Sequence, residues 1–265
     1  MGQTWIDPVI FSVGPLQVRW YGAMYVMGFV LGGLLLKYLS NKKVWPLPAE
    51  TIDKYVTWLI LGMFFGARLA YVFVYNWEYY SVNLADIFSV WKGGLSFHGA
   101  VVGMCFSTWL FARSHKVNFY QISDCMAIAG TQGLFWGRMG NFINGELYGR
   151  VTESWAGVVF PGGGPFPRHP SQLYEGVLEG IVLSIAVFIA HRKQKYIGLA
   201  GAVFVGGYGV MRFIVEFFRE PDPQLGYYFS YFTMGQILCL LMIPVAFGVY
   251  KHSQKYQIPN PVYRG

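Results

Sequence analysis

The chain has 265 residues, of which 54% are hydrophobic and 12% charged, and its mean hydropathy is +0.38. Soluble domains carry about 25% charged residues, so this composition excludes an ordinary soluble globular protein and predicts a membrane protein. The formal net charge is +7. Because the lysines gather at the ends of apolar runs, we expect no nucleic-acid partner.

The cysteines and the N-terminus exclude two further classes. Cys105, Cys125 and Cys239 each lie inside an apolar run, and no C-x-x-C or zinc-type spacing is present. We therefore expect small buried side chains, with no metal site and no cofactor. No Lys or Arg precedes Arg19, so we expect no cleaved signal peptide.

Continuous apolar runs predict membrane-spanning helices, which need about 20 mostly apolar residues each. The predicted spans are residues 20–39, 55–75, 97–112, 121–137, 172–190, 198–217 and 231–250. The fold expected is an all-α polytopic membrane protein with seven transmembrane helices that form one integral domain, residues 1–265. The segment 138–170 is rich in glycine and proline, which predicts turns and short strands outside the membrane.

The distribution of Lys and Arg predicts the orientation. With seven spans, one side holds twelve of the twenty basic residues and the other side holds seven, while Arg68 lies within a span. The richer side is expected to be cytoplasmic. The N-terminus and the segment 138–170 then lie outside and the C-terminus inside.

Charges at the outer ends of the spans form the first candidate site, because a charge within the bilayer costs about 2.5–3.5 kcal/mol and usually has a partner. Arg212, Glu216 and Arg219 have i,i+4 and i,i+3 spacing, which places them on one helical face. Glu216 is expected to orient both guanidinium groups, and the remaining net charge of +1 suits an anion. The structural alternative is an ion-pair ladder.

A second cluster is GRMGNFINGELYGR at 137–150. Arg138 offers a planar fork for phosphate oxygens, Asn141 and Asn144 offer neutral donors, and Glu146 is expected to orient an arginine. Glycines such as Gly149 allow the backbone to approach a ligand. The alternative is a turn that leaves a helix.

Two more motifs contain candidate groups. His98, in the segment at 92–99, titrates near neutrality and is a candidate general base; the alternative is a hydrogen-bonded structural histidine. In RHPSQLYE at 168–175, His169 or Ser171 is expected to cap a span, and Gln172 and Glu175 are near enough to reach the site. Tyr21 starts the first predicted span. Considered without the other motifs, it is typical of an aromatic side chain that anchors a helix at the membrane interface.

Six ordered motifs resemble the prolipoprotein diacylglyceryl transferase family over nearly the whole chain. They are DPVIFSVGP at 7–15, RWYG at 19–22, GGLSFHG at 93–99, GRMGNFINGELYGR at 137–150, RHPSQLYE at 168–175 and RFIVEFFREPD at 212–222. The resemblance implies a bacterial inner-membrane enzyme. It would move the diacylglyceryl group of phosphatidylglycerol onto the lipobox cysteine of a prolipoprotein, forming a thioether and releasing glycerol-1-phosphate.

The resemblance also implies residue roles. Catalysis is expected from His98, Arg138, Glu146, Arg212 and Glu216. Phosphatidylglycerol is expected to contact Tyr21, Arg138, Asn141, Asn144, Gly149, Arg212 and Arg219. The partners are then phosphatidylglycerol, the prolipoprotein signal peptide and membrane lipids, with the site towards the outer leaflet.

Two other functions remain open on the residues alone. A secondary transporter would bind an anion with buried arginines, but it predicts inverted repeats, and none is clear here. An intramembrane protease or acyltransferase would need a Ser, Cys or paired-Asp nucleophile with a base, and the aspartates are not paired within spans.

Overall fold

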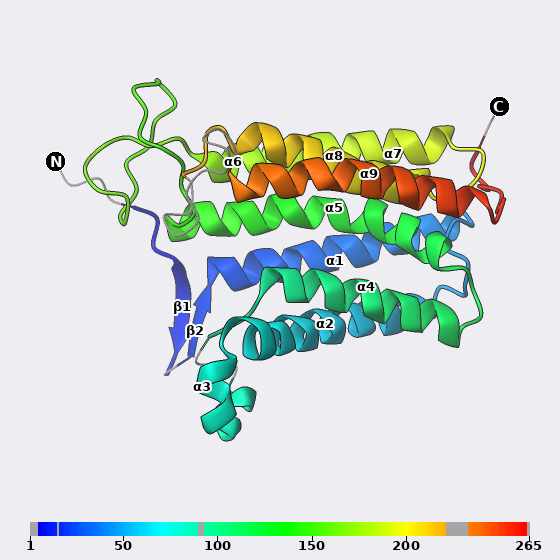
Figure 1. Ribbon diagram of the computed structural model, residues 1–265, viewed down its shortest axis with the longest axis horizontal. Helices are drawn as coiled ribbons and strands as arrows, with labels where there is room; N and C mark the ends of the chain where they lie inside the picture. Colours follow the sequence, from blue (N-terminus) through cyan, green and yellow to red (C-terminus); the bar gives the residue numbers. More distant parts are fainter. Residues whose placement is uncertain (1–4, 15, 90–92, 221–232, 264–265) are drawn as a thin grey trace. The chain divides into compact units, whose positions relative to one another are not determined.

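The computed structural model describes residues 5–14, 16–89, 93–220 and 233–263 (Figure 1). The chain forms two compact units. The larger unit combines residues 1–38 with 124–265, and the smaller unit comprises residues 39–123.

The larger unit begins with a β-hairpin that the all-α prediction missed. Strands β1 (Val9–Val13) and β2 (Leu16–Arg19) pair antiparallel, with Phe11 opposite Val18. The turn begins at Gly14, whose φ of 59° lies in the left-handed region that glycine adopts readily. In β2 the side chains Leu16, Gln17, Val18 and Arg19 alternate between apolar and polar, which is typical of a strand.

Helices α1 (Trp20–Asn41) and α5 (Phe119–Asn144) approach closely within the larger unit. A Cβ added at Gly28 would lie 3.4 Å from the Cα of Gly133, so the two backbones are in contact there. Gln132 Nε2 also donates a hydrogen bond to the Gly28 carbonyl at 2.8 Å. Small residues at a crossing allow such contact between membrane helices.

The end of α5 differs from the predicted boundary at 137. The helix continues to Asn144 and ends at Gly145, whose φ is 67°. Glu146 N–H donates to the Asn141 carbonyl at 3.1 Å, which closes the helix by a Schellman-type bond. The predicted irregular segment at 138–170 is therefore wrong for residues 138–144, and Arg138 is a helical residue.

The rest of the larger unit is helical apart from the loops. Its elements are α6 (Ser171–Glu175), the π-helix η4 (Gly176–Val182), α7 (Leu183–Lys193), α8 (Leu199–Val215) and α9 (Met234–Gln254). The first three form one continuous helix over Ser171–Lys193. Between α5 and α6 the loop contains isolated bridges of Arg168 with Val151 and Val158, in line with the short strands expected there.

The start of α8 is fixed by a buried carboxylate. Asp124 accepts hydrogen bonds from the N–H groups of Gly198 and Gly201 at 2.7 and 2.9 Å and from the Gln194 amide at 2.9 Å. Gln194 in turn accepts from the Leu199 N–H at 2.8 Å. These side chains satisfy the N–H groups that a helix start leaves without an intrahelical partner.

The smaller unit is built on two helices that cross through glycines. Its elements are α2 (Thr51–Ala70), the π-helix η1 (Tyr71–Tyr75), α3 (Trp77–Val82), the 3₁₀-helix η2 (Leu84–Phe88) and α4 (Phe97–Ser114). A Cβ at Gly66 would meet the Gly99 carbonyl and lie 2.7 Å from the Gly103 Cα. Gly62 and Gly66 therefore let α2 contact α4 directly.

Arg68, the one arginine predicted within a span, is a buried structural group of the smaller unit. Its guanidinium donates to the carbonyls of Asp86, Ile87, Gly93 and Gly94 at 2.6 to 3.0 Å. Every donating nitrogen has a backbone partner, so this charge fixes the segment that leads into α4.

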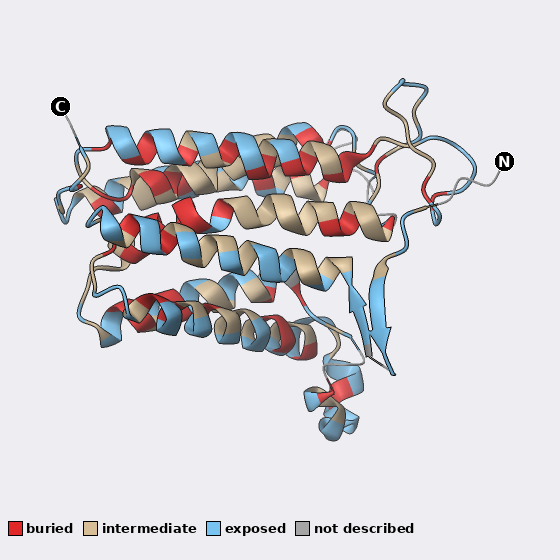
Figure 2. Ribbon diagram, turned by 180° about the vertical axis from the view of Figure 1, so that it is seen from behind, coloured by how far each residue is buried: buried red, intermediate tan, exposed pale blue. Residues whose placement is uncertain are grey.

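The described helices fit a multi-pass membrane protein. Four of them are long and apolar enough to cross a membrane, namely Trp20–Asn41, Thr51–Tyr75, Ser171–Lys193 and Met234–Gln254, and α8 is a shorter apolar helix. Exposed positions run along these helices (Figure 2) and include large apolar side chains such as Val26, Phe65 and Leu241. Lipid is the solvent that such surfaces require.

Candidate active site

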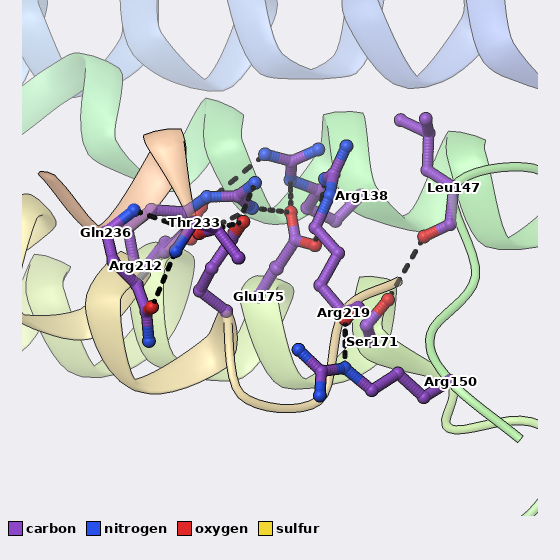
Figure 3. Close-up of polar contacts among 11 residues, drawn as sticks. Arg138, Leu147, Arg150, Ser171, Glu175, Arg212, Arg219, Thr233 and Gln236 are labelled. Atoms are coloured by element: carbon purple, nitrogen blue, oxygen red, sulfur yellow. Dashed lines mark hydrogen bonds and ion pairs between the residues drawn. The ribbon is translucent and has the colours of Figure 1, made fainter. Parts of the chain in front are cut away.

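Glu175 gathers three arginines from separate parts of the chain (Figure 3). Its Oε2 lies 2.7 Å from Arg138 Nε and 2.9 Å from Arg212 Nη1, and its Oε1 lies 3.5 Å from Arg219 Nη1. Arg138 belongs to α5, while Arg212 lies in the last turn of α8 and Arg219 follows that helix. The structure thus brings together the three arginines that the sequence assigned to phosphate binding.

Two further carboxylates complete the cluster. Glu179, one helical turn after Glu175, lies 3.6 Å from Arg138 Nη2 and 3.8 Å from Arg212 Nη1. Glu216 Oε2 lies 3.3 Å from Arg212 Nη2. Three arginines and three glutamates give a formally neutral group, in place of the net charge of +1 expected from the 212–219 motif alone.

The two kinds of charge differ in exposure. The side chains of Arg138, Arg212 and Arg219 are 17, 15 and 19% exposed, whereas those of Glu175 and Glu179 are 0% exposed. The carboxylates therefore lie behind the guanidinium groups. The accessible side of this neutral cluster is cationic, and its fixed N–H donors suit an anion.

Glu216 does not hold two arginines as the motif suggested. Helix α8 ends at Val215, so Arg219 does not lie on the same helical face as Arg212 and Glu216. Arg219 forms an ion pair with Glu175. Glu216 instead accepts a hydrogen bond from the hydroxyl of Thr233 at 3.0 Å. Thr233 also caps α9, so Glu216 ties the end of α8 to the start of α9.

Glycines on the continuous helix bring α5 to the cluster. A Cβ at Gly180 would lie 2.5 Å from the Phe135 Cβ and 2.8 Å from its Cα, and one at Gly176 would lie 3.6 Å from the Arg138 Cβ. Because these glycines adjoin Glu175 and Glu179 in sequence, the close approach of the backbones places Arg138 within reach of both carboxylates.

Glu146 lies at the end of α5 and contacts amides. Its Oε1 accepts hydrogen bonds from Asn141 Nδ2 at 2.9 Å and from Asn144 Nδ2 at 3.2 Å. A carboxylate only accepts, so both amides must turn their NH₂ groups towards it. The expected role of Glu146 in orienting an arginine stays a prediction, and so does donation by the two asparagines to a ligand.

The segment that follows α5 is held by the start of α6. Ser171 Oγ donates to the Leu147 carbonyl at 3.0 Å, and Gln172 Nε2 donates to the Glu146 carbonyl at 2.6 Å. The predicted capping by Ser171 or His169 is wrong, because the residue before α6 is Pro170 and it makes no side-chain cap. The first turn of α6 thus positions both the cluster and the 146–147 segment.

Gly149 is packed tightly between backbones. Its N–H donates to the His169 carbonyl at 2.8 Å, and it forms an isolated bridge with Arg219. A Cβ there would meet the Phe218 carbonyl. Arg150 Nε donates to the Arg219 carbonyl at 2.8 Å, so this stretch fixes the backbone that carries Arg219.

Tyr21 lies in the larger unit, at the start of α1. Its hydroxyl is 3.1 Å from that of Tyr25. A Cβ at Gly140 would lie 2.9 Å from the Tyr21 ring, so this ring lies against α5 within one turn of Arg138 and Asn141.

His98 belongs to the smaller unit. It lies in the first turn of α4, it is exposed, and its Nδ1 is 3.2 Å from the Tyr75 hydroxyl. Its assignment as a general base stays a prediction. Within the residues that the structure describes, no group of three or more His, Cys, Asp and Glu side chains is arranged to hold a metal ion.

Sequence reasoning missed Glu179 and gave Glu175 no specific role, although it placed Glu175 near enough to reach the site. Glu175 was only one of several polar residues in RHPSQLYE, and Glu179 was not singled out. The available signal was a pair of carboxylates at i,i+4 inside an apolar run, since such charges require buried cationic partners. Their partners lie on other helices, and one sequence does not identify them.

Comparison with known proteins gives one consistent result. Residues 8–251 match the model of the family described as prolipoprotein diacylglyceryl transferase. Similar proteins named phosphatidylglycerol–prolipoprotein diacylglyceryl transferase occur in Nitratidesulfovibrio vulgaris (strain DP4), Brucella anthropi and Geobacter sulfurreducens. They are 48, 47 and 44% identical to the chain, cover 90, 90 and 89% of it, and are themselves covered over 91, 88 and 91% of their length.

Proposed function

We infer from these matches that the chain, which belongs to the prolipoprotein diacylglyceryl transferase family, transfers the diacylglyceryl group of phosphatidylglycerol to a prolipoprotein. The acceptor is the thiol of the lipobox cysteine, the product is a thioether, and glycerol-1-phosphate leaves. This is the first step of bacterial lipoprotein maturation.

The observation that carries the site assignment is the accessible cationic side of the arginine cluster. Phosphatidylglycerol carries one negative charge on its phosphodiester, and more negative charge develops on the leaving phosphate during transfer. Arg138 and Arg212 hold that phosphate in our proposal, with Arg219 as a third donor, and Glu175 and Glu179 keep the guanidinium groups in place. Fixed donors at low dielectric stabilise developing charge without reorganisation.

The proposed transfer is a direct displacement. The thiol sulfur bonds to the terminal carbon of the diacylglycerol unit, the bond from this carbon to the phosphate oxygen breaks, and the electron pair stays on the phosphate. A free thiol has a pKa of about 8.5, so only a small part is thiolate at neutral pH. We assign removal of the thiol proton to His98, on the family resemblance.

The remaining residues bind or support the lipid headgroup. Tyr21 and Asn141 approach the phosphate or its glycerol from the α1–α5 crossing, and Asn144 adds an amide at the end of α5. Glu146 fixes both amides. Gly149 acts through the backbone that carries Arg219.

We further propose that the chain crosses the bacterial inner membrane seven times as one integral domain. The helices α1, α2–η1, α4, α5, α6–α7, α8 and α9 correspond in order to the seven predicted spans. The distribution of basic residues supports a periplasmic N-terminus, a cytoplasmic C-terminus and a site towards the outer leaflet.

Substitution of three residues tests this proposal. Arg138→Lys, Arg212→Lys and His98→Ala are assayed for thioether formation on a synthetic lipobox peptide in phosphatidylglycerol vesicles. Lysine keeps the charge and loses the planar fork, and alanine removes the proposed base. We therefore expect each of the three variants to lose most of its activity. Arg192→Lys, an exposed change near the end of α7, is the matched control. Near-normal rates in all three site variants would remove the proposed site.

A further inference from the structure

The start of α4 is fixed against α2 on both sides of His98. Ser96 N–H donates to the Ala67 carbonyl at 3.0 Å, and Ser96 Oγ accepts from the Gly99 N–H at 3.2 Å. A Cβ at Gly99 would meet the Gly66 carbonyl, so the two neighbouring helices are in backbone contact next to His98 (Figure 1). His98 therefore lies on a backbone whose neighbours on either side are held by α2.

Tyr75 is brought to His98 by the π-helix that continues α2. Asn76 N–H donates to the Tyr71 carbonyl at 3.1 Å, which closes the last π-type turn. Turns of this kind are rare and frequently occur at functional sites. At the end of the turn the Tyr75 hydroxyl lies 3.2 Å from His98 Nδ1, and both side chains are exposed. This contact leaves the second ring nitrogen, Nε2, to face a substrate.

Two charged groups of the same unit are bound to other partners. The carboxylate of Asp86 accepts a hydrogen bond from the Tyr79 hydroxyl at 2.6 Å, and the guanidinium of Arg68 donates to backbone carbonyls. Tyr75, by contrast, contacts the imidazole itself. A role for Tyr75 therefore has to act through His98.

The roles of the two ring nitrogens follow from what a base must do. A neutral imidazole has one N–H donor and one acceptor nitrogen. To take a thiol proton at Nε2, His98 must hold its own proton at Nδ1, and the Tyr75 oxygen is the acceptor that this N–H meets. The opposite tautomer carries its proton on Nε2 and cannot accept another there. The hydrogen bond at one nitrogen thus determines whether the other nitrogen is a base.

We propose that Tyr75 is a positioning residue for the transfer: its phenol oxygen accepts a hydrogen bond from His98 Nδ1–H and keeps Nε2 free for the thiol proton. The proton passes from the thiol sulfur to Nε2, the sulfur displaces the phosphate, and the imidazolium then releases the proton to water. The bond from Nδ1–H is kept in both protonation states, so the ring does not have to turn. The proposal rests on the proposed function, because it takes His98 as the base.

The test uses a pH at which the acceptor needs no base. A thiol with a pKa of about 8.5 is about 1% ionised at pH 6.5 and about 90% ionised at pH 9.5, so a base is required chiefly at the lower pH. We would measure kcat/KM for a synthetic lipobox peptide in phosphatidylglycerol vesicles at both pH values. The variants are Tyr75→Phe, His98→Ala and Arg212→Lys. Tyr79→Phe is the matched control, since it removes a hydroxyl of the same unit that binds Asp86.

At the lower pH we expect kcat/KM to fall about tenfold in Tyr75→Phe and about 10²-fold in His98→Ala, because general-base catalysis contributes at least that much. At the higher pH both variants should approach the parent protein, and this recovery also shows that they are folded. Arg212→Lys should stay impaired at both pH values, because phosphate binding does not depend on the thiol. Tyr79→Phe should match the parent protein throughout.

The outcomes separate this proposal from the proposed function. Parent-like activity of Tyr75→Phe at the lower pH, beside an impaired His98→Ala, overturns the proposal and leaves the proposed function intact. A loss in Tyr75→Phe that persists at the higher pH also overturns it, because the hydroxyl then serves the fold and not the base. Full activity of His98→Ala at the lower pH removes the base and the proposal with it. If Arg212→Lys is fully active as well, the proposed function itself fails.

Discussion

Replacing Glu175 with glutamine removes one negative charge from the point where three guanidinium groups meet. Two of its ion-pair contacts, to Arg138 at 2.7 Å and to Arg212 at 2.9 Å, are the shortest in the cluster. Removing one partner of a buried ion pair costs about 3–5 kcal/mol. Glutamine keeps one acceptor oxygen and presents an NH₂ group in place of the other, so at least one arginine loses its acceptor.

The displaced arginine determines the size of the effect. A shift of about 1 Å in a positioning group costs about 10²-fold in rate, so kcat/KM for Glu175→Gln should fall by about 10²-fold, or about 2.7 kcal/mol. Glu179→Gln should cost less, because its contacts of 3.6 and 3.8 Å are longer. Glu153→Gln, at an exposed loop position, should leave the rate unchanged.

The assay is diacylglyceryl transfer from phosphatidylglycerol vesicles to a synthetic lipobox peptide, with thermal unfolding of each purified variant measured alongside. A folded Glu175→Gln protein with kcat/KM within threefold of the parent would refute the argument that this carboxylate positions the arginines. A larger loss in Glu179→Gln than in Glu175→Gln would refute the ranking by distance.

Three further changes test the scaffold. Gly180→Ala places a Cβ against the Phe135 backbone, so we expect the unfolding free energy to fall by about 1–3 kcal/mol and the transfer rate to fall as well. Gly248→Ala is the control. A Cβ at Gly248 would have no atom within 4 Å, so this change should be neutral or slightly stabilising. Asp124→Ala removes three hydrogen bonds at the start of α8, so the unfolding free energy should fall by about 3 kcal/mol while kcat/KM at low temperature stays normal. Arg68→Lys should lower the unfolding free energy by about 2 kcal/mol, because an ammonium group cannot reproduce the planar set of bonds to four carbonyls; an unchanged unfolding transition would contradict the structural role given to that charge.

Hydropathy predicted the order of the helices well because lipid selects continuous apolar runs. It failed at the end of α5, where polar residues continue the helix to Asn144. Those polar side chains form hydrogen bonds with one another, since the amides of Asn141 and Asn144 both donate to Glu146. The change from apolar to polar residues therefore did not coincide with the end of the helix. The Asn144–Gly145 pair was the better stop signal, since glycine commonly follows the last helical residue.

The arginines of the site were predictable and their arrangement was not. A charged residue in an apolar run signals that a partner exists, and this identified Arg138, Arg212 and Arg219. The partner Glu175 is far from each of them in sequence, and it is reached through a π-helical stretch with Gly176 and Gly180. Such contacts depend on helix crossings, which local periodicity does not specify.

The neutrality of the cluster changes the reason for expecting an anion. Counting charges in the 212–219 motif gave an excess of +1, but the folded cluster contains equal numbers of guanidinium and carboxylate groups. Neutrality lowers the cost of placing six charges in a helical membrane protein. Anion binding then depends on which charged groups are accessible. The carboxylates of Glu175 and Glu179 are buried, whereas the three guanidinium groups are partly exposed. It follows that removing the charge of Glu175 makes the site more positive and still weakens catalysis, whereas an argument from net charge predicts tighter binding of the phosphate and no loss of rate.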